Sequence, residues 1–445
     1  MVSEDRSLAG QVLSHIYTPK LATFHEKSGL TAHESLRRCD VLLPNVFEAD
    51  LPRLEYMDAD NPEDAHRRIR QAQEQSPIAM GLLGPEILSY ELVRSVLSDS
   101  RFCVAQGMLL AAQGVTSTRL SERVRTTLMS LSGAEHRRMR RLAGEAFGPR
   151  SAARLATTIA DVISALVEPV VEAGRGDVVD DIARRYPSPV LGAFLGASQK
   201  DWQLFSRWAD DICWMFTGQA AVKQDVIMAA YDELDAYIAD MVAARRDNPT
   251  GDVVSELIRS HEGDQLTDAE LRMLVSGLLI AGTDTVRNQL AAAAHVLCDH
   301  PDQWALLGEH PELAAQAVTE LVRHTPAAIF VVRQAVEEVE LAGVVIPAGT
   351  RVVINTAAAN RDPNVYEDPQ RLDITRDIRS PILTFGAGVR NCLGAHLART
   401  ELTQALMLMT RRMRNPRRAG PAPWKPFAQL TGPAALPIEF DRAAI

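Results

Sequence analysis

The sequence has few cysteines, few aromatic residues and no long apolar run. Five cysteines occur among 445 residues, and 5% of the residues are aromatic. The cysteines form no C-x-x-C pair, which disfavours a disulfide framework and a zinc site built from local ligand pairs. No apolar run approaches the roughly 18 residues that span a bilayer, and the N-terminus lacks the pattern of a secretory signal. We therefore expect a soluble, cytoplasmic protein without a transmembrane anchor.

The charge balance is acidic and the composition is that of a globular protein. Lys and Arg number 47 against 57 Asp and Glu, and the net charge of −10 disfavours nucleic acid as a partner. Hydrophobic residues make up 46% of the chain and charged residues 23%. These values predict a folded chain rather than a disordered or fibrous one.

Apolar residues recur at helical spacing over most of the chain, and Val- and Ile-rich segments typical of strands are few. The sequence predicts strands at residues 329–335, 339–346 and 351–357, and helices at residues 151–173, 199–216, 221–246 and 399–414. The expected fold is mainly α with small β-sheets, in a single large helix-rich domain. Residues 1–56 show no strong period, so we expect an N-terminal extension there and the domain at residues 57–445.

One long helix is expected in the second half of the chain. A capping-box pattern, Thr267 with Glu270, begins it, and the helical pattern extends over roughly 50 Å. Residues 271–282 are apolar almost all round, which predicts burial within the domain. Asp284 and Thr285 follow directly. Taken alone, they indicate a polar patch where the helix reaches solvent, or a kink, because burial without partners costs free energy.

A glycine-rich segment with one cysteine lies near the C-terminus. It reads FGAGVRNCLG from Phe385 to Gly394 and contains Gly386, Arg390 and Cys392. Its glycines exclude a regular helix or strand and permit backbone amides to converge on one atom. The arginine and the start of the following helix add positive charge, which favours a thiolate. The alternative is a buried structural cysteine, which leaves the glycines unexplained.

This segment resembles the haem-ligand loop of the cytochrome P-450 superfamily, F-x-x-G-x-[HR]-x-C-x-G, at every defined position. Three more motifs of that family occur in the expected order. They are H-x-x-x-R at His136 and Arg140, [AG]-G-x-[DE]-T at residues 281–285, and E-x-x-R at Glu320 and Arg323. The resemblance covers the chain from roughly residue 57 to the end. It implies the cytochrome P-450 fold, in which a long buried central helix lies over the haem.

The resemblance also implies a cofactor and the residues that hold it. Cys392 would bind the iron of haem b (iron protoporphyrin IX) as an axial thiolate. Positively charged or donor side chains would clamp its two propionates, and the resemblance implies this role for His136, Arg140, Arg333 and Arg390. Asp284 and Thr285 would be catalytic, with the acid relaying protons and the hydroxyl organising dioxygen and water. The implied cofactor-binding residues are His136, Arg140, Ala281, Arg333, Phe385, Gly386, Arg390, Cys392 and Gly394.

A structural role is implied for Glu320 and Arg323. Family resemblance predicts that this pair is buried and joined by Arg371, whereas local spacing alone predicts an exposed ion pair on one helix face. By the same resemblance, the substrate region includes residues 102–120, the end of the helix at 202–216, Ala281 and residues 327–330.

The implied function is that of a haem-thiolate monooxygenase, which inserts one atom of dioxygen into an apolar small molecule. Electrons would come from a separate ferredoxin-type donor with its reductase, because the chain has no grouped cysteines for an iron–sulfur cluster. The alternatives are a peroxygenase or isomerase-type member, and a non-enzymatic haem-based gas sensor, against which Asp284 and Thr285 argue. A docking face for the donor, or else a merely solvated surface, is expected at Arg137, Arg138, Arg141, Arg390, Arg399, Arg411, Arg412, Arg414, Arg417 and Arg418.

Overall fold

Helices form most of the described chain, as the periodic Ala- and Leu-rich segments predict. The computed structural model describes residues 43–104, 110–111, 113–144, 147–216, 219–259 and 266–442. No helix in these ranges is both long enough and apolar enough to cross a membrane. The α-helices are α2 (Pro62–Gln73), α3 (Tyr90–Ser98), α5 (Thr118–Arg125), α6 (Gly133–Gly144), α7 (Pro149–Arg154), α8 (Ala156–Ala173), α9 (Pro187–Leu195), α10 (Trp202–Cys213), α11 (Ala220–Asp247), α12 (Val253–Arg259), α13 (Asp268–Cys298), α14 (Pro301–Glu309), α15 (Ala314–His324), α16 (Thr356–Ala359) and α17 (Ala395–Arg412).

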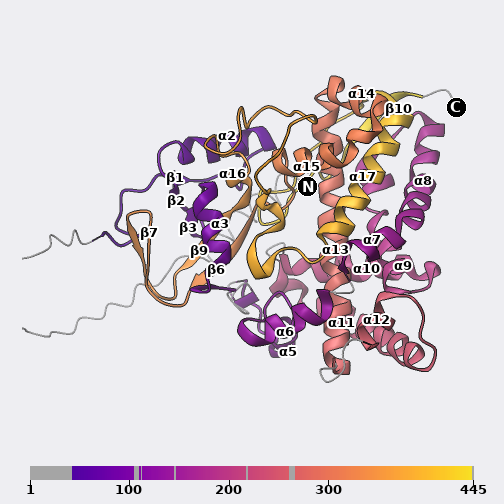
Figure 1. The fold of residues 1–445 in the computed structure, drawn as a ribbon, viewed down its shortest axis with the longest axis horizontal. Helices are drawn as coiled ribbons and strands as arrows, with labels where there is room; N and C mark the ends of the chain where they lie inside the picture. The colour runs from indigo at the N-terminus through magenta and orange to yellow at the C-terminus, as the bar shows by residue number, and fades with distance from the viewer. Residues whose placement is uncertain are drawn as a thin grey trace, which may run out of the picture.

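The strands form one larger sheet and two small ones. The larger sheet has the strand order β1-β2-β3-β9-β6-β4, and it lies on the side of the molecule opposite most of the long helices (Figure 1). The small sheets are β10-β11-β5 and the hairpin β7-β8. The strands are β1 (Arg53–Leu54), β2 (Ile78–Gly81), β3 (Gly84–Ile87), β4 (Phe102–Cys103), β5 (Arg175–Asp177), β6 (Phe330–Ala335), β7 (Val339–Leu341), β8 (Val344–Ile346), β9 (Arg351–Asn355), β10 (Met413–Arg418) and β11 (Pro437–Arg442).

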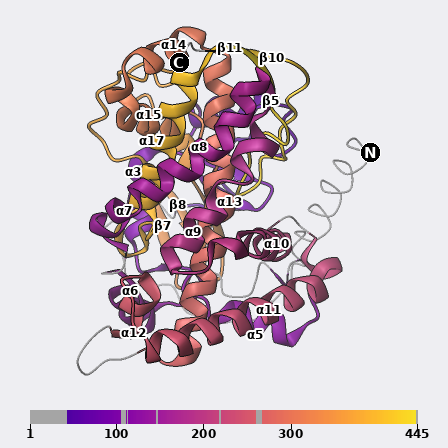
Figure 2. The ribbon, with the colours of Figure 1, turned by 90° about the vertical axis from the view of Figure 1, so that its right-hand side faces the viewer.

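The central helix α13 confirms the long buried helix expected from the sequence. It has 31 residues, and its capping box is present: Thr267 Oγ1 accepts from the Glu270 amide at 3.2 Å, and Glu270 Oε2 accepts from the Thr267 amide at 2.8 Å. It contacts α9, α10, α11 and α17. Figures 1 and 2 show it running through the middle of the helical part of the molecule.

Some element boundaries differ from those expected, each for a local reason. The expected strand 339–346 is a hairpin, because Ala342 and Gly343 adopt positive φ angles of 48° and 83°. The expected strand 351–357 ends at Asn355, whose side chain caps α16 by accepting from the Ala358 amide. The expected helix 399–414 starts earlier, at Ala395, and gives way to β10.

Residues 43–56 belong to the folded part of the chain. Arg53 and Leu54 pair in parallel with β2, and the Val46 amide donates to the carbonyl oxygen of Val345 at 2.9 Å. Val46 and Tyr56 are buried. The boundary at residue 56 expected from the sequence therefore lies too far along the chain, and residues 1–42 of the expected extension lie outside the described residues.

Candidate functional site

The cysteine loop folds back on itself before it leads into α17. Leu383–Phe385 form a short 3₁₀ turn. Gly386 and Gly388 have φ angles of +74° and +65°, in the left-handed region that glycine tolerates without steric cost. The Cys392 amide donates to the carbonyl oxygen of Phe385 at 2.7 Å. This backbone geometry holds Cys392 close to the start of α17.

Cys392 has one backbone donor and two guanidinium groups near its sulfur. Burial leaves the pKa of the Cys392 thiol above its ordinary value, although the hydrogen bond from the Gly394 amide and the charges of Arg140 and Arg399 oppose the shift. Protein surrounds the Cys392 sulfur on most sides, but part of the side chain stays accessible to solvent, whereas Cys213 is buried. A sulfur that receives an N–H donor and nearby positive charge suits a thiolate that binds a metal ion.

Three arginines and one histidine from three segments converge beside this loop. Helix α6 supplies His136 and Arg140, strand β6 supplies Arg333, and the loop supplies Arg390. Burial lowers the pKa of His136 to about 4, and Arg390 and Arg140 lower it further. The ring is therefore neutral at neutral pH and acts as a hydrogen-bonding group. The structure thus brings together the four residues that the sequence analysis assigned to the propionates.

Acidic side chains do not supply the main electrostatic partners of this cluster. Burial lowers the pKa of Arg333 to about 10, and Arg390 lowers it further while Cys103 opposes the shift. Burial also lowers the pKa of Arg390 and of Arg140, whose charged neighbours include each other and the thiols of Cys103 and Cys392. Partly buried guanidinium groups, which all carry positive charge, favour an anionic ligand. The donor set therefore fits a group with two carboxylates, as haem b has.

Asp284 and Thr285 lie in the middle of α13, and one side of the helix is accessible there. Ala281 and Thr285 are exposed although the residues that follow are again buried, so the polar pair does not mark the end of the buried helix. Thr285 Oγ1 donates to the carbonyl oxygen of Ala281 at 2.7 Å. Asp284 pairs with Arg287 at 2.9 Å, and Arg287 pairs with Asp210 of α10 at 2.6 Å. These partners offset the cost of placing an acid within the domain.

The buried pair Glu320 and Arg323 has a different third partner from the one expected. Both side chains are 0% exposed, and Arg323 Nε lies 2.7 Å from Glu320 Oε2. Arg376 pairs with Glu320 Oε1 at 3.2 Å. The guanidinium of Arg371 is 65% exposed and pairs with Asp373, and only its carbonyl oxygen accepts from Arg323. The expectation that Arg371 joins the pair through its side chain is wrong, because that side chain points to solvent.

Arg399 is a residue of the site that the sequence analysis placed elsewhere, on the docking face. Its guanidinium lies 4.7 Å from the ring centre of Phe385 and lowers the pKa of Cys392. Arg399 lies about one turn after Ala395, where α17 begins, so its place early in the helix that follows the cysteine is the sequence signal that could have indicated this position.

The remaining arginines expected to form one docking face are divided between two places. Those from 411 to 418 lie at the far end of α17 or on β10, roughly 25 Å along the helix axis from the loop. Acids also pair with several: the pairs are Arg138 with Glu270, Arg412 with Glu168, Arg417 with Asp441 and Arg418 with Asp299. The expectation of one continuous face is therefore wrong.

Comparison with known proteins decides the family. The sequence model of the family described as Cytochrome P450 matches residues 175–416. The chain belongs to the cytochrome P450 family. This P450 is 34% identical over 404 residues to the luteothin monooxygenase of Streptomyces thioluteus, which covers 89% of this chain and 97% of that protein. It is 36% identical over 359 residues to the mycinamicin IV hydroxylase/epoxidase of Micromonospora griseorubida. That match covers 79% of this chain and 88% of the relative.

Solved structures of the family share the fold of this P450. The crystal structure of CalO2 matches with a TM-score of 0.82 at 30% identity, covering 88% of this chain and 100% of that one. P450BioI, solved in complex with an acyl carrier protein ligated to hexadec-9Z-enoic acid, matches with a TM-score of 0.78 at 27% identity, covering 85% and 99%. The fold class predicted from the sequence is confirmed, and the chain is a haem-thiolate monooxygenase whose family binds haem b through a cysteine.

Proposed function

We propose that Cys392 is the axial thiolate ligand of the haem iron and that the cluster of His136, Arg140, Arg333 and Arg390 holds the propionates. The observation that carries this proposal is the excess positive charge next to a sulfur that receives a backbone donor. The bound haem supplies the activation of dioxygen, which a thiolate ligand favours. The protein contributes the charge and the donors that fix the group in one orientation.

In this proposal Asp284 and Thr285 deliver protons to the site. The Thr285 hydroxyl donates to the carbonyl oxygen of Ala281, and its own oxygen remains able to accept a hydrogen bond from a water molecule. The Asp284 side chain is 21% exposed, so it can exchange protons with water and resupply the hydroxyl. The two side chains hold and pass protons on an accessible face of α13.

The substrate is an apolar small molecule in this proposal. Ala281 leaves the accessible face of α13 apolar one turn before the hydroxyl. Two aromatic side chains of α10 belong to the core instead: Phe205 and Trp208 are buried and pack against Tyr237 of α11, with ring centres 5.2 and 5.7 Å away. The relatives are named for different compounds, among them luteothin and mycinamicin IV, which supports the class of reaction more than any one substrate.

The absorption spectrum of the reduced protein with carbon monoxide tests the ligand assignment. Thiolate ligation shifts the Soret band to long wavelength, so we expect this band in the wild type and its loss in Cys392→Ser. Cys103→Ser is the matched control, because the Cys103 thiol lies close to Arg333 and Arg390 and is the alternative thiolate. Retention of the band by Cys392→Ser, or its loss from Cys103→Ser, would contradict the assignment.

Electrons come, we further propose, from an acidic ferredoxin-type protein that docks beside the cysteine loop. Met129 and Val389 are 58% and 64% exposed, and Arg390 joins their segments by donating to the carbonyl oxygen of Met129 at 3.4 Å. Arg137 of α6 is also exposed. An apolar centre with positive charge at its rim supports transient docking of a partner of opposite charge.

The dependence of first-electron transfer on ionic strength tests the docking proposal. With an acidic ferredoxin, the rate should fall as salt screens the charges, and Arg137→Glu should lower the rate at low salt and flatten the dependence. Arg414→Glu is the control and should behave like the wild type, because Arg414 is exposed on β10, beyond the far end of α17. A flat dependence in the wild type, or equal effects of the two variants, would refute this docking site.

A further inference from the structure

Two side chains in the middle of α13 donate to carbonyl oxygens of their own helix. Thr285 Oγ1 donates to Ala281 at 2.7 Å, and Asn288 Nδ2 donates to Asp284 at 2.7 Å. Side-chain hydrogen bonds of this kind compete with the backbone bonds of a helix and occur where helices bend. The geometry of residues 284–288, which we call the polar turn, therefore depends on side-chain contacts.

A lysine from near the end of the chain holds Asn288 from outside the helix. Lys425 Nζ donates to Asn288 Oδ1 at 2.7 Å. An amide group has an oxygen at one end and an NH2 group at the other, and only the NH2 end can donate. Because an ammonium group needs an acceptor, Lys425 keeps the oxygen of Asn288 on its own side. The NH2 group then points to the carbonyl oxygen of Asp284.

The loop that carries Lys425, which we call the C-terminal loop (residues 423–434), also lies directly against Asn288. A Cβ atom at Gly432 would lie 2.8 Å from Asn288 Oδ1 and 3.1 Å from its Cβ atom. A residue with a side chain could therefore replace Gly432 only if Asn288 moved. The Lys425 amide donates to the carbonyl oxygen of Gly432 at 3.0 Å, so both residues lie at the same point of the loop. The C-terminal loop thus fixes Asn288 by a hydrogen bond and by shape.

The charge of Lys425 lies among other charges of the site. Its side chain is partly buried, and burial lowers the pKa of Lys425. The charge of Asp284 opposes this shift, whereas Arg287 and Arg184 add to it. An amide acceptor offsets only part of the free energy that it costs to bury an ammonium group. The contact is therefore better explained by its effect on the polar turn than by a gain in stability.

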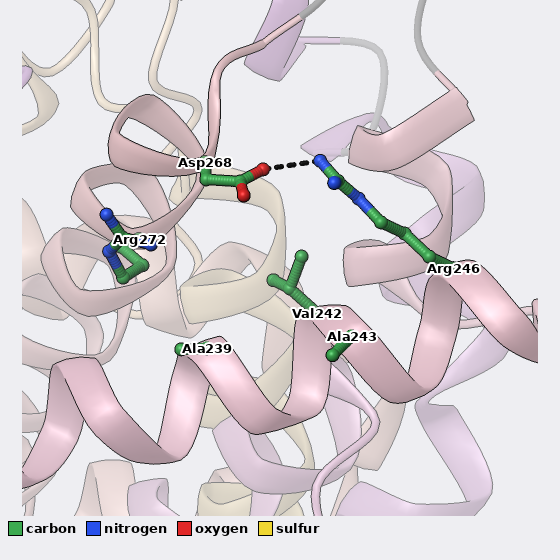
Figure 3. A pocket seen from close by; sticks show the side chains of 6 residues that line it. All are labelled: Ala239, Val242, Ala243, Arg246, Asp268 and Arg272. Atoms are coloured by element: carbon green, nitrogen blue, oxygen red, sulfur yellow. Dashed lines mark hydrogen bonds and ion pairs between the residues drawn. The ribbon is translucent and has the colours of Figure 1, made fainter.

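Helix α13 is anchored on both sides of the polar turn. At its start, Asp268 forms an ion pair with Arg246 of α11, and Figure 3 shows the two side chains meeting there. Beyond the turn, Trp424 of the C-terminal loop donates through Nε1 to His295 Nε2 at 3.0 Å, about two turns after Asn288. Because both sides are held, a change at Asn288 alters the polar turn more than the rest of the helix.

We propose that Lys425 is a positioning residue for proton delivery, and that it acts through Asn288 on the carbonyl oxygen of Asp284. This inference rests on the proposed function, because it takes Asp284 and Thr285 as the groups that hold and pass protons. Loss of the contact lets the Asn288 amide group rotate and frees the carbonyl oxygen of Asp284. The two side chains then face the accessible side of α13 at a different angle.

Hydrogen exchange of the haem-loaded protein tests the contact itself. Lys425→Met removes the donor and keeps an unbranched side chain, and Lys200→Met, at an exposed lysine, is the matched control. We expect amides of residues 285–292 to exchange about fivefold faster in Lys425→Met, as the loss of one hydrogen bond predicts, and at the wild-type rate in Lys200→Met. Gly432→Ala, which displaces Asn288 without removing a charge, should have the same effect as Lys425→Met. Equal exchange in the wild type and Lys425→Met would overturn the proposal.

The partition of dioxygen between two products tests the role in proton delivery. With electrons from NADPH, supplied through an acidic ferredoxin and its reductase, each dioxygen molecule forms hydrogen peroxide by taking up two electrons and two protons, or two water molecules by taking up four of each. Without added substrate, Lys425→Met should lower the ratio of water to peroxide about fivefold, measured from the NADPH and dioxygen consumed and the peroxide formed.

Two outcomes of this assay count against different claims. A lower Tm of Lys425→Met with an unchanged ratio of water to peroxide would show a structural role only, and would overturn the proposal. An unchanged ratio in Thr285→Ala would instead refute proton delivery by the polar turn, and with it that part of the proposed function, whatever the exchange rates show.

Discussion

Glu86 is a buried carboxyl group whose hydrogen-bond partners are neutral, and this makes the stability of the domain depend on pH. The residue lies on β3 and is 1% exposed. Its Oε1 atom accepts from the Tyr56 hydroxyl at 2.8 Å and from the Asn355 amide group at 2.6 Å. Burial raises the pKa of Glu86 from 4.5 to about 7, although both hydrogen bonds oppose the shift.

The sign of the effect follows from the direction of this shift. The folded protein holds the proton between pH 4.5 and about 7, where the unfolded chain has released it. The stabilisation linked to the proton is complete below pH 4.5 and is lost as the pH rises through about 7. A rise of about 2.5 pKa units corresponds to ~3 kcal/mol. The Glu86→Gln side chain keeps an oxygen that accepts both hydrogen bonds, and it does not ionise. The variant therefore does not lose this stabilisation as the pH rises.

Calorimetric melting at pH 5 and pH 8 measures the difference. For a folded chain of about 400 residues, ~3 kcal/mol corresponds to about 4 °C in Tm. Between pH 5 and pH 8 the Tm of the wild type should therefore fall by about 4 °C more than the Tm of Glu86→Gln. Glu340→Gln, on the exposed side of β7, is the control and should keep a constant difference from the wild type. Parallel curves of Tm against pH for Glu86→Gln and the wild type would refute the reasoning.

Other expected outcomes concern the ion-pair network, the central helix and proton delivery. In urea unfolding, Arg376→Gln should cost about 2–3 kcal/mol because buried Glu320 loses a charged donor, whereas Arg371→Gln should change stability by less than about 0.5 kcal/mol; equal midpoints would contradict this network. Thr267→Ala should cost about 1 kcal/mol in the same assay, since it removes the capping box, and an unchanged midpoint would show that the cap does not contribute. Thr285→Ala should bind haem normally but release more hydrogen peroxide per product, measured against reductant consumed; unchanged coupling would remove Thr285 from proton delivery.

Features encoded by neighbouring residues were predictable from the sequence. The capping box at Thr267 and Glu270 depends on residues three apart, and its hydrogen bonds form as expected. The cysteine loop is similarly local, because its glycines and Cys392 lie within ten residues and need no distant partner to bend the chain. The mainly helical fold with a buried central helix followed from apolar periodicity summed over long segments.

Features that depend on distant partners were not predictable in this way. Arg371 and Arg376 lie in one loop with similar local sequence, and only the approach of α15 selects Arg376 for the buried carboxylate. The strand at Arg53 and Leu54 is too short to show a period and forms only because β2 lies beside it. In the sequence, the arginines at the end of α17 form a basic cluster with few acidic neighbours. Their acidic partners are far away along the chain, such as Glu168 for Arg412.

The charge around the cysteine loop links cofactor choice to the stability of the domain. The buried charge of Glu320 is matched within the protein, by Arg376 among others. Arg140, Arg333 and Arg390 instead have pKa values lowered by burial, and guanidinium groups lie near one another. Burying like charges costs free energy that an anionic ligand offsets, and a ligand that binds only the folded chain stabilises it by mass action. The arginines that favour a group with two carboxylates therefore also couple binding of that group to folding of this side of the domain.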